Sequence, residues 1–256
     1  MTEPKTDAAK AAALLQQGLF HHRQRQLPQA MERYIEVLKG DPTNADALYY
    51  VAVVACEDGQ YQQGIDLAKR AIEVGKPQAR VHNLMGQAYD RLHQPLEAIK
   101  AYDAAIALDP NFAAAHGNRA SILADTGFPA EALKAYDRAL ALNANSGADW
   151  LNRGTLLHDM GQLDQAIESF ERALALAPDQ PQAHAGRGVA LMGLGKFDDA
   201  LLALDRAIKI YPAFAVAHRA RAATLMGLKR DDEAKVSLDR AEEIEKAERV
   251  ETGPTN

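Results

Sequence analysis

The sequence predicts an all-α fold built from tandem helix–turn–helix units. Three observations carry the prediction: one phrase recurs every 34 residues, apolar residues follow helical spacing, and Gly or Pro recurs at fixed places. The recurring phrase reads AYDAAIALDP, AYDRALALNA, SFERALALAP and ALDRAIKIYP. Aromatic residues make up only 6% of the chain and alanine is abundant, which favours closely packed helices over a bulky sheet core.

The spacing divides most of the chain into seven windows without insertion or deletion. Each window carries two apolar faces spaced three and four residues apart, such as His82, Met85 and Tyr89 followed by Ala98 and Tyr102. We therefore expect two amphipathic helices per window. The windows are 11–44, 45–78, 79–112, 113–146, 147–180, 181–214 and 215–248, and we expect a disordered tail over 1–10 and another tail over 249–256.

Small residues occupy three places of every window, counted from its first residue. They let two helices approach closely, because a larger side chain would hold the axes apart. The eighth place holds Gly18, Ala52, Gly86, Ala120, Gly154, Gly188 and Ala222, the twentieth holds Ala30, Gly64, Ala98, Ala132, Ala166, Ala200 and Ala234, and the twenty-seventh holds Val37, Ala71, Ala105, Ala139, Ala173, Ala207 and Ala241. These places predict helix contacts rather than chemistry.

Turn residues mark where each helix ends. Gly separates the two helices of four windows, and Pro follows the second helix of four windows. At the seventh window, Lys235 and Glu242 replace the apolar residues of earlier windows, so we expect this window to cap the array. The turn residues are Gly59, Gly127, Gly161 and Gly195, and the stop residues are Pro42, Pro110, Pro178 and Pro212.

Composition excludes several classes of function. With 29 Lys and Arg against 35 Asp and Glu, the net charge of −6 argues against nucleic-acid binding, which depends on basic contacts to phosphate. The single cysteine, Cys56, excludes an internal disulfide framework and a multi-cysteine zinc site. No apolar stretch reaches the roughly 18 residues of a membrane span, and no signal peptide is evident, so we expect a cytoplasmic protein.

Four histidines recur at the fourth place of their windows, where a fifth window has Trp150. A metal ion needs its His nitrogens within about 2.1 Å, whereas equivalent residues of neighbouring helices are about 8–10 Å apart. We therefore interpret the histidines as packing residues and expect no metal and no cofactor. They are His82, His116, His184 and His218.

Four arginines recur at the seventh place, each sixteen residues after a carboxylate. Ion pairs between one unit's second helix and the next unit's first helix would satisfy these charges, and an anion-binding ladder is the alternative. The pairs are Asp103 with Arg119, Asp137 with Arg153, Glu171 with Arg187, and Asp205 with Arg221. We identify no nucleophile elbow, phosphate-binding glycine loop or His-Glu-x-x-His motif, so we expect no catalysis.

Small residues at places eight, twenty and twenty-seven, a large residue at places four and twenty-four, and Pro at place thirty-two resemble the tetratricopeptide repeat over all seven windows. His21, Ala68, Lys76 and Lys246 depart from that pattern. The resemblance implies a right-handed superhelical solenoid. It also implies that places two, five, six, nine, twelve and thirteen of each first helix face a ligand.

In this sequence those places give an amide-rich wall. The candidate binding residues are Tyr49, Tyr50, Arg80, Asn83, Gln87, Arg91, Asn118, Ser121, Asn152, Thr155 and His158. Asn118 and Asn152, one window apart, resemble rungs of the asparagine ladder of O-linked N-acetylglucosamine transferases and would pair with the backbone of an extended peptide. The cations of the carboxylate clamp in the chaperone-binding subgroup are missing, and beyond Asn152 the wall becomes small and apolar.

The resemblance thus implies a non-catalytic interaction scaffold that binds another protein, as an extended peptide or a helix, in its concave groove. Two alternatives stay open. The first is a substrate-recruiting or regulatory arm of an enzyme complex such as a glycosyltransferase, and the second is a scaffold that assembles with further copies of itself.

Overall fold

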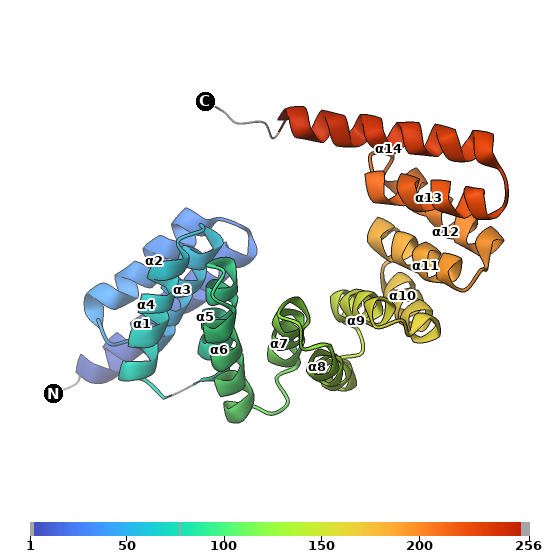
Figure 1. The fold of residues 1–256 in the computed structure, drawn as a ribbon. Coiled ribbons are helices and arrows are strands. Elements are labelled where there is room, and N and C mark those ends of the chain that lie inside the picture. The colour runs from blue at the N-terminus through green and yellow to red at the C-terminus, as the bar shows by residue number, and fades with distance from the viewer. Residues whose placement is uncertain (1–2, 77, 252–256) are drawn as a thin grey trace. The chain divides into compact units, whose positions relative to one another are not determined.

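The computed structural model describes residues 3–76 and 78–251, which form fourteen α-helices and no strand (Figure 1). The chain divides into two compact units, Met1–Phe128 and Pro129–Asn256. The first unit contains α1 (Glu3–Arg23), α2 (Leu27–Gly40), α3 (Ala45–Glu57), α4 (Tyr61–Val74), α5 (Ala79–Arg91), α6 (Pro95–Leu108) and α7 (Ala113–Asp125). The second contains α8 (Pro129–Leu142), α9 (Gly147–Asp159), α10 (Leu163–Leu176), α11 (Pro181–Gly193), α12 (Phe197–Ile210), α13 (Ala215–Gly227) and α14 (Asp231–Glu251).

The helix starts follow the 34-residue spacing. From α3 onward, each odd-numbered helix begins at the first residue of its predicted window, at 45, 79, 113, 147, 181 and 215. The even-numbered helices begin at place seventeen of every window. Each window is therefore one pair of helices, the first helix and the second helix of a repeat.

Local signals fix the helix ends. The side-chain oxygen of Asn44 accepts a hydrogen bond from the backbone N–H of Ala47 at 3.0 Å, which caps the start of α3. Proline occupies the first turn of α6 as Pro95, where its missing N–H has no intrahelical partner to lose. α2, α6, α10 and α12 each end two residues before the prolines expected to stop them.

The turn inside every repeat uses one backbone conformation at place fifteen. The φ angle there is positive in all seven repeats, from 57° at His93 to 86° at Gly127. Glycine adopts this left-handed region without steric cost, and four repeats have it. The other three repeats carry Arg25, His93 and Lys229, so the turn imposes the conformation on residues that disfavour it.

The small residues are helix contacts, as predicted. All the residues at places eight, twenty and twenty-seven are buried. A Cβ atom on Gly86 would lie 2.4 Å from Cε1 of Tyr102, and one on Gly154 would lie 2.8 Å from Cδ1 of Phe170. The ring of the second helix thus fills the space that the missing side chain leaves on the first helix.

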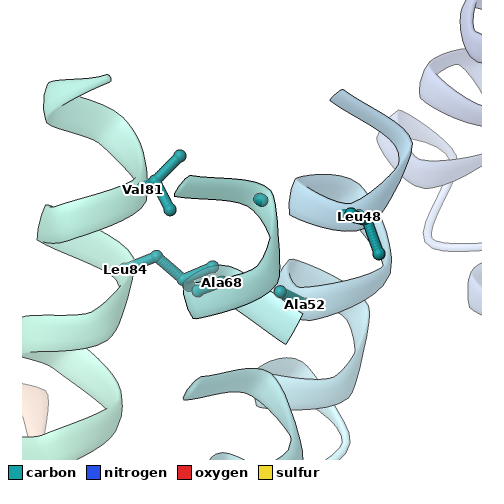
Figure 2. Packing of buried hydrophobic residues seen from close by; sticks show 6 residues of the cluster. Leu48, Ala52, Ala68, Val81 and Leu84 are labelled. Atoms are coloured by element: carbon teal, nitrogen blue, oxygen red, sulfur yellow. The ribbon is translucent and has the colours of Figure 1, made fainter. Parts of the chain in front are cut away.

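Each hydrophobic cluster joins neighbouring repeats. Figure 2 shows one cluster, in which Leu48 and Ala52 of α3, Ala68 of α4, and Val81 and Leu84 of α5 face one another. All five side chains are buried. Helices in each unit pack mainly on their sequence neighbours, so the core is a series of small clusters along the repeats.

Two features of the structure bear on the expected organisation. The seven expected windows over 11–248 are distributed over two units, whose boundary lies between α7 and α8. A repeat contacts only its neighbours, so no common core spans the whole array. We also expected a disordered tail over 1–10, whereas α1 begins at Glu3. Of the expected tail over 249–256, residues 249–251 belong to α14, and 252–256 lie outside the described residues.

The seventh repeat has the polar second helix that we expected of a cap. Lys235 and Glu242 are exposed, whereas Leu201 at the equivalent place of the sixth repeat is buried. α14 has 21 residues, and each of the other second helices has 14. Among the described residues, no helix is both long and apolar enough to cross a membrane.

Candidate functional site

The fourth-place histidines hold the turns between repeats. The Nε2 atom of His184 donates a hydrogen bond to the backbone oxygen of Pro178 at 2.9 Å, and His116 and His218 bond to the prolines six residues before them at 3.1 and 3.0 Å. Trp150 does the same through Nε1, which lies 2.9 Å from the backbone oxygen of Ala144. These contacts confirm the packing interpretation for the three histidines. Burial lowers the pKa of the fourth, His82.

The residues described, 3–76 and 78–251, contain no group of three or more His, Cys, Asp or Glu side chains that could hold a metal ion. At place four, a polar ring serves where another repeat has an indole, since each supplies one N–H donor to the equivalent carbonyl of the preceding turn.

The seventh-place arginines form the predicted ion pairs. Nε of each arginine donates to the carboxylate sixteen residues earlier, at 2.6 to 3.0 Å. Arg153 and Arg221 also donate through Nη1 to Ser169 and Ser237, at 2.7 and 2.6 Å. Because each guanidinium group pairs with a carboxylate and each arginine side chain is no more than 31% exposed, these pairs support the structural interpretation of the ladder. The pairs are Arg119 with Asp103, Arg153 with Asp137, Arg187 with Glu171, and Arg221 with Asp205.

The first helices of neighbouring repeats form one layer in the first unit, where α5 contacts both α3 and α7. Three predicted binding residues meet in this layer. The guanidinium carbon of Arg80 lies 4.5 Å from the ring centroid of Tyr49, and its Nη1 atom donates to the hydroxyl of Tyr50 at 3.3 Å. Nη2 donates to Oδ1 of Asp46, and Nε donates to Oε1 of Gln78 at 2.7 Å. Arg80 is therefore fixed over an aromatic surface by four polar and aromatic neighbours.

The tyrosine surface continues inward. The rings of Tyr50 and Tyr34 are stacked with centroids 5.1 Å apart, and Tyr34 is fully buried. Burial raises the pKa of Tyr34 to about 12 and also raises that of Tyr49. Tyr34 and Tyr49 stay neutral at physiological pH and act as packing groups.

Asparagines join the third and fourth repeats. Nδ2 of Asn118 on α7 donates to Oδ1 of Asn83 on α5 at 3.1 Å. Asn83 is buried, at 8% exposure, whereas Asn118 is half-buried. Asn83 therefore positions Asn118, and Asn118 is the more exposed of the two amides.

Three further predicted residues of the first unit lie on the same two helices. Gln87 and Arg91 are exposed on α5, and Ser121 is half-buried on α7. Together with Asn118 and Arg80 they give this face amide, hydroxyl and guanidinium groups. Such groups can donate and accept hydrogen bonds along a peptide backbone.

The predicted residues of the second unit lie on α9. Asn152 and Thr155 are exposed, and His158 is half-buried. The Thr155 hydroxyl donates to the backbone oxygen of Leu151 at 3.2 Å, and Nδ1 of His158 lies 3.1 Å from Oδ1 of Asp159. Asn118 belongs to the first unit and Asn152 to the second.

Beyond α9, part of the expected small and apolar wall is filled by the protein itself. A Cβ on Gly186 would lie 2.6 Å from Cζ of Phe170, so this glycine accommodates a core ring. Ala185 is buried, whereas Val216 and Met226 of α13 are 60% and 54% exposed. Of the first helices in this unit, α13 therefore carries the exposed large apolar side chains.

Two ion pairs that involve a residue of a first helix were not predicted as pairs. Asp46 and Arg80 stand at place two of successive repeats, so opposite charge at one place was a usable signal. Arg219 on α13 binds Glu245 on α14. This second pair had no signal in the repeat pattern, because Glu245 lies beyond the length of the other second helices.

Comparison with protein families matches the chain to models described as tetratricopeptide repeat. The matched residues are 21–88, 79–112, 111–177, 151–215 and 186–246. A comparison with curated proteins gives no match.

Solved structures with the same fold share little sequence with the chain. Pseudomonas aeruginosa pilF has a TM-score of 0.77 and 20% identity, over 85% of this chain and 99% of that one. MamA has a TM-score of 0.60 and 24% identity, over 64% and 96%. YrrB, described as a TPR protein with an unusual peptide-binding site, has a TM-score of 0.54 and 21% identity, over 66% and 88%. These likenesses establish the all-α repeat fold.

Proposed function

Because the chain belongs to the tetratricopeptide repeat family, we propose that it is a non-catalytic adaptor. It binds an extended peptide or a partner helix of another protein on the face formed by its first helices. We place this activity in the cytoplasm. The protein's own contribution is recognition, since the side chains on this face are amides, hydroxyls and paired ions.

The amide pair of Asn118 and Asn83 is the observation that carries the proposal. An asparagine fixed by a buried neighbour loses less side-chain entropy when it binds, which increases affinity. One N–H and the oxygen lone pairs of Asn118 are not used by that bond. These are the groups that a peptide backbone N–H and C=O would need.

The Arg80 cluster supports the same mode of binding one repeat earlier. Arg80 is held over Tyr49 and against Asp46, so the cluster offers a rigid, nearly neutral, amphipathic surface. Rigid aromatic and arginine side chains are frequent anchors at protein interfaces because little entropy is lost on binding. YrrB, a solved structure of the same fold that is described as having an unusual peptide-binding site, supports the proposal of a peptide ligand.

The test is affinity capture from the source lysate, with the partners identified by mass spectrometry. We compare wild type with two double variants, Asn118→Ala/Asn152→Ala and Gln87→Ala/Arg91→Ala. The partners captured by each double variant are identified in a separate experiment. The control is Asn145→Ala, an exposed asparagine in the turn between α8 and α9. Melting temperatures of all variants establish that the fold is retained.

We expect a partner that the control variant retains and that at least one of the two double variants, Asn118→Ala/Asn152→Ala or Gln87→Ala/Arg91→Ala, loses. A partner retained by all variants would contradict binding on this face and move the site to Tyr49 and Tyr50, the second helices or the ends. Capture of a transferase would support the alternative of a recruiting arm. A mass that rises with concentration would support self-assembly instead.

A further inference from the structure

The second unit contains an internal arginine–carboxylate fork on its layer of first helices. Nε of Arg219 donates to Oε1 of Glu245 at 2.6 Å, and Nη2 donates to Oε2 at 2.6 Å. Two parallel N–H···O bonds are the geometry with which arginine recognises a free carboxylate group. Arg219 lies on α13 and Glu245 on α14, so the fork connects two helices of the last repeat.

Neither member of the fork belongs to the repeating pattern. Glu245 is the first residue of α14 beyond the 14-residue length of the other second helices. Arg219 stands at place five, where every other repeat has an uncharged residue. Those residues are Leu15, Tyr49, Asn83, Gly117, Leu151 and Ala185. The fork is thus particular to this end of the chain, unlike the ion-pair ladder that recurs between repeats.

Arg219 is also the sole Arg or Lys at the six ligand-facing places of the fifth, sixth and seventh repeats. Its side chain is 48% exposed, and Val216, one turn earlier on α13, is 60% exposed. The hydrogen bond to Glu245 raises the pKa of Arg219, and the same bond lowers the pKa of Glu245. Both groups are charged at neutral pH, so another carboxylate binds the guanidinium by taking the place of Glu245.

We propose that Arg219 is a carboxylate-binding subsite of this face and that Glu245 occupies it as a built-in competitor. This inference rests on the proposed function, because the ligand is a peptide on the same layer of first helices. The ligand group is a peptide carboxylate, either a free C-terminus or an acidic side chain. It replaces the Glu245 carboxylate in the fork and releases the last turns of α14 from α13.

The free energies involved favour exchange of the Glu245 carboxylate for a ligand carboxylate over a fork that stays permanently occupied by Glu245. An exposed ion pair contributes little to folding, since water screens it and two long side chains lose entropy. Replacing one carboxylate by another keeps both N–H···O bonds of the guanidinium. Contacts with the exposed apolar surface of Val216 and Met226 then give a peptide an advantage that Glu245 lacks.

The test follows the Arg219 Nε–Hε signal by NMR during titration of the intact chain with defined peptides. The signal is assigned by its loss in Arg219→Lys. The probes are acetyl-tetraalanine with a free C-terminus, the same peptide as its C-terminal amide, and an amidated acetyl-Ala-Glu-Ala-Ala. The free C-terminus and the glutamate peptide distinguish the two sources of carboxylate. Circular dichroism establishes that α14 stays helical in each variant.

We expect Glu245→Gln to bind a carboxylate probe at least tenfold more tightly than wild type, and not to bind the amide. Arg219→Ala/Glu245→Gln lacks the reporter N–H, so its binding is followed by the backbone amide signals of α13, and it should lose this gain. Glu242→Gln is the matched control, because it removes an exposed charge from α14 without removing a hydrogen bond to Arg219. Glu245→Asp keeps the charge on a shorter side chain and should give an intermediate affinity.

Equal binding of the amide and the acid, or no gain in Glu245→Gln over Glu242→Gln, would overturn the subsite. Those outcomes leave the capture experiment on Asn118, Asn152, Gln87 and Arg91 unaffected. Conversely, if the capture experiment finds no partner that depends on these four residues, the titration of the Arg219 signal can still succeed. The two failures are therefore distinguishable.

Discussion

Arg153 joins Asp137 across two repeats, with Nε of the guanidinium 2.8 Å from Oδ1 of the carboxylate. The same guanidinium donates to the Ser169 hydroxyl at 2.7 Å, and Ser169 is fully buried. One arginine on α9 thus connects α8 and α10. The pair with its serine recurs at Arg221, whereas Arg187 has the carboxylate but faces an alanine, Ala203, at the serine's place.

The first prediction concerns this difference. Arg153→Ala should lower the free energy of unfolding by about 1 kcal/mol, because it removes an ion pair and a hydrogen bond to a buried hydroxyl. Arg187→Ala, the matched control, should cost about half as much, since an exposed ion pair alone contributes little. Urea unfolding followed by circular dichroism measures both. Unchanged stability in Arg153→Ala, or in the charge reversal Arg153→Glu, would contradict the structural role of the ladder.

Much of the fold was predictable because the repeat spacing constrains every helix at once. Ala45, Ala79 and Ala113 each begin a first helix where the 34-residue windows begin. The start of α1 at Glu3 was not predicted, because the repeat pattern carries no information about residues ahead of the first window. Residues 5–14 contain several good helix formers and no Gly, which favours a longer α1. Proline at the second residue of α1 is compatible with a helical first turn.

The candidate site was predictable only in part. The repeat places identify which residues of a first helix share a face, so they identified Arg80 and Asn118. They do not give contacts between repeats, which is why the burial of Asn83 beneath Asn118 was missed. The fork of Arg219 and Glu245 depends on the extra length of α14, and a repeat pattern carries no information about residues beyond its unit.

Enlarging a contact alanine should test the packing. Ala166 is fully buried beside Leu157, Phe170 and Ala190. Ala166→Leu should cost about 1–3 kcal/mol, because it overpacks a filled core. Ala175→Leu on the same helix is exposed and should change little. We expect Ala132→Leu to behave like Ala166→Leu. Equal urea midpoints for Ala166→Leu and Ala175→Leu would contradict the assignment of place twenty as a helix contact.

Place fifteen, where the φ angle is positive, gives a prediction in which a substitution does not lower stability. Lys229 has a φ angle of 58°, which strains a residue with a Cβ atom. Lys229→Gly should keep or raise stability, by up to about 1 kcal/mol, since relief of strain exceeds the entropy that glycine loses. Lys134 is exposed in the interior of α8, where glycine lowers helix propensity, so Lys134→Gly should destabilise by about 1 kcal/mol. Thermal unfolding compares the two, and the same change for both would exclude a role for the φ angle.

The hydrogen bonds from place four predict that a ring with an N–H donor preserves more stability than a ring without one. His184→Phe should cost about 1 kcal/mol, because the backbone oxygen of Pro178 loses its N–H donor. His184→Trp should cost less, since Trp150 shows that an indole at this place reaches the equivalent oxygen of Ala144 at 2.9 Å. Urea midpoints of the two variants decide the matter. A tryptophan variant no more stable than the phenylalanine variant would mean that ring packing, rather than the donor, determines this place.

The alkylation rate of the single cysteine tests how it is buried in the second repeat. Cys56 is half-buried, and burial raises its pKa to about 11, with the nearby charge of Glu57 adding to the effect. Because the thiolate is the reactive form, about one thiol in a thousand is reactive at pH 8, against about one in four for a free cysteine. Alkylation by iodoacetamide should therefore be at least tenfold slower in the folded protein than after unfolding in urea.

The pH dependence separates the raised pKa from simple obstruction. If the thiolate fraction limits the reaction, the rate in the folded protein should rise about tenfold per pH unit between 8 and 10, below the pKa of Cys56. The unfolded protein should level off near pH 9, above the ordinary thiol pKa of about 8.5. A folded rate that levels off at the same pH would show an ordinary thiol pKa. A slow rate that did not change with pH would show that reaction waits for opening of the contact between α3 and α4, where Cys56 lies against Gly64.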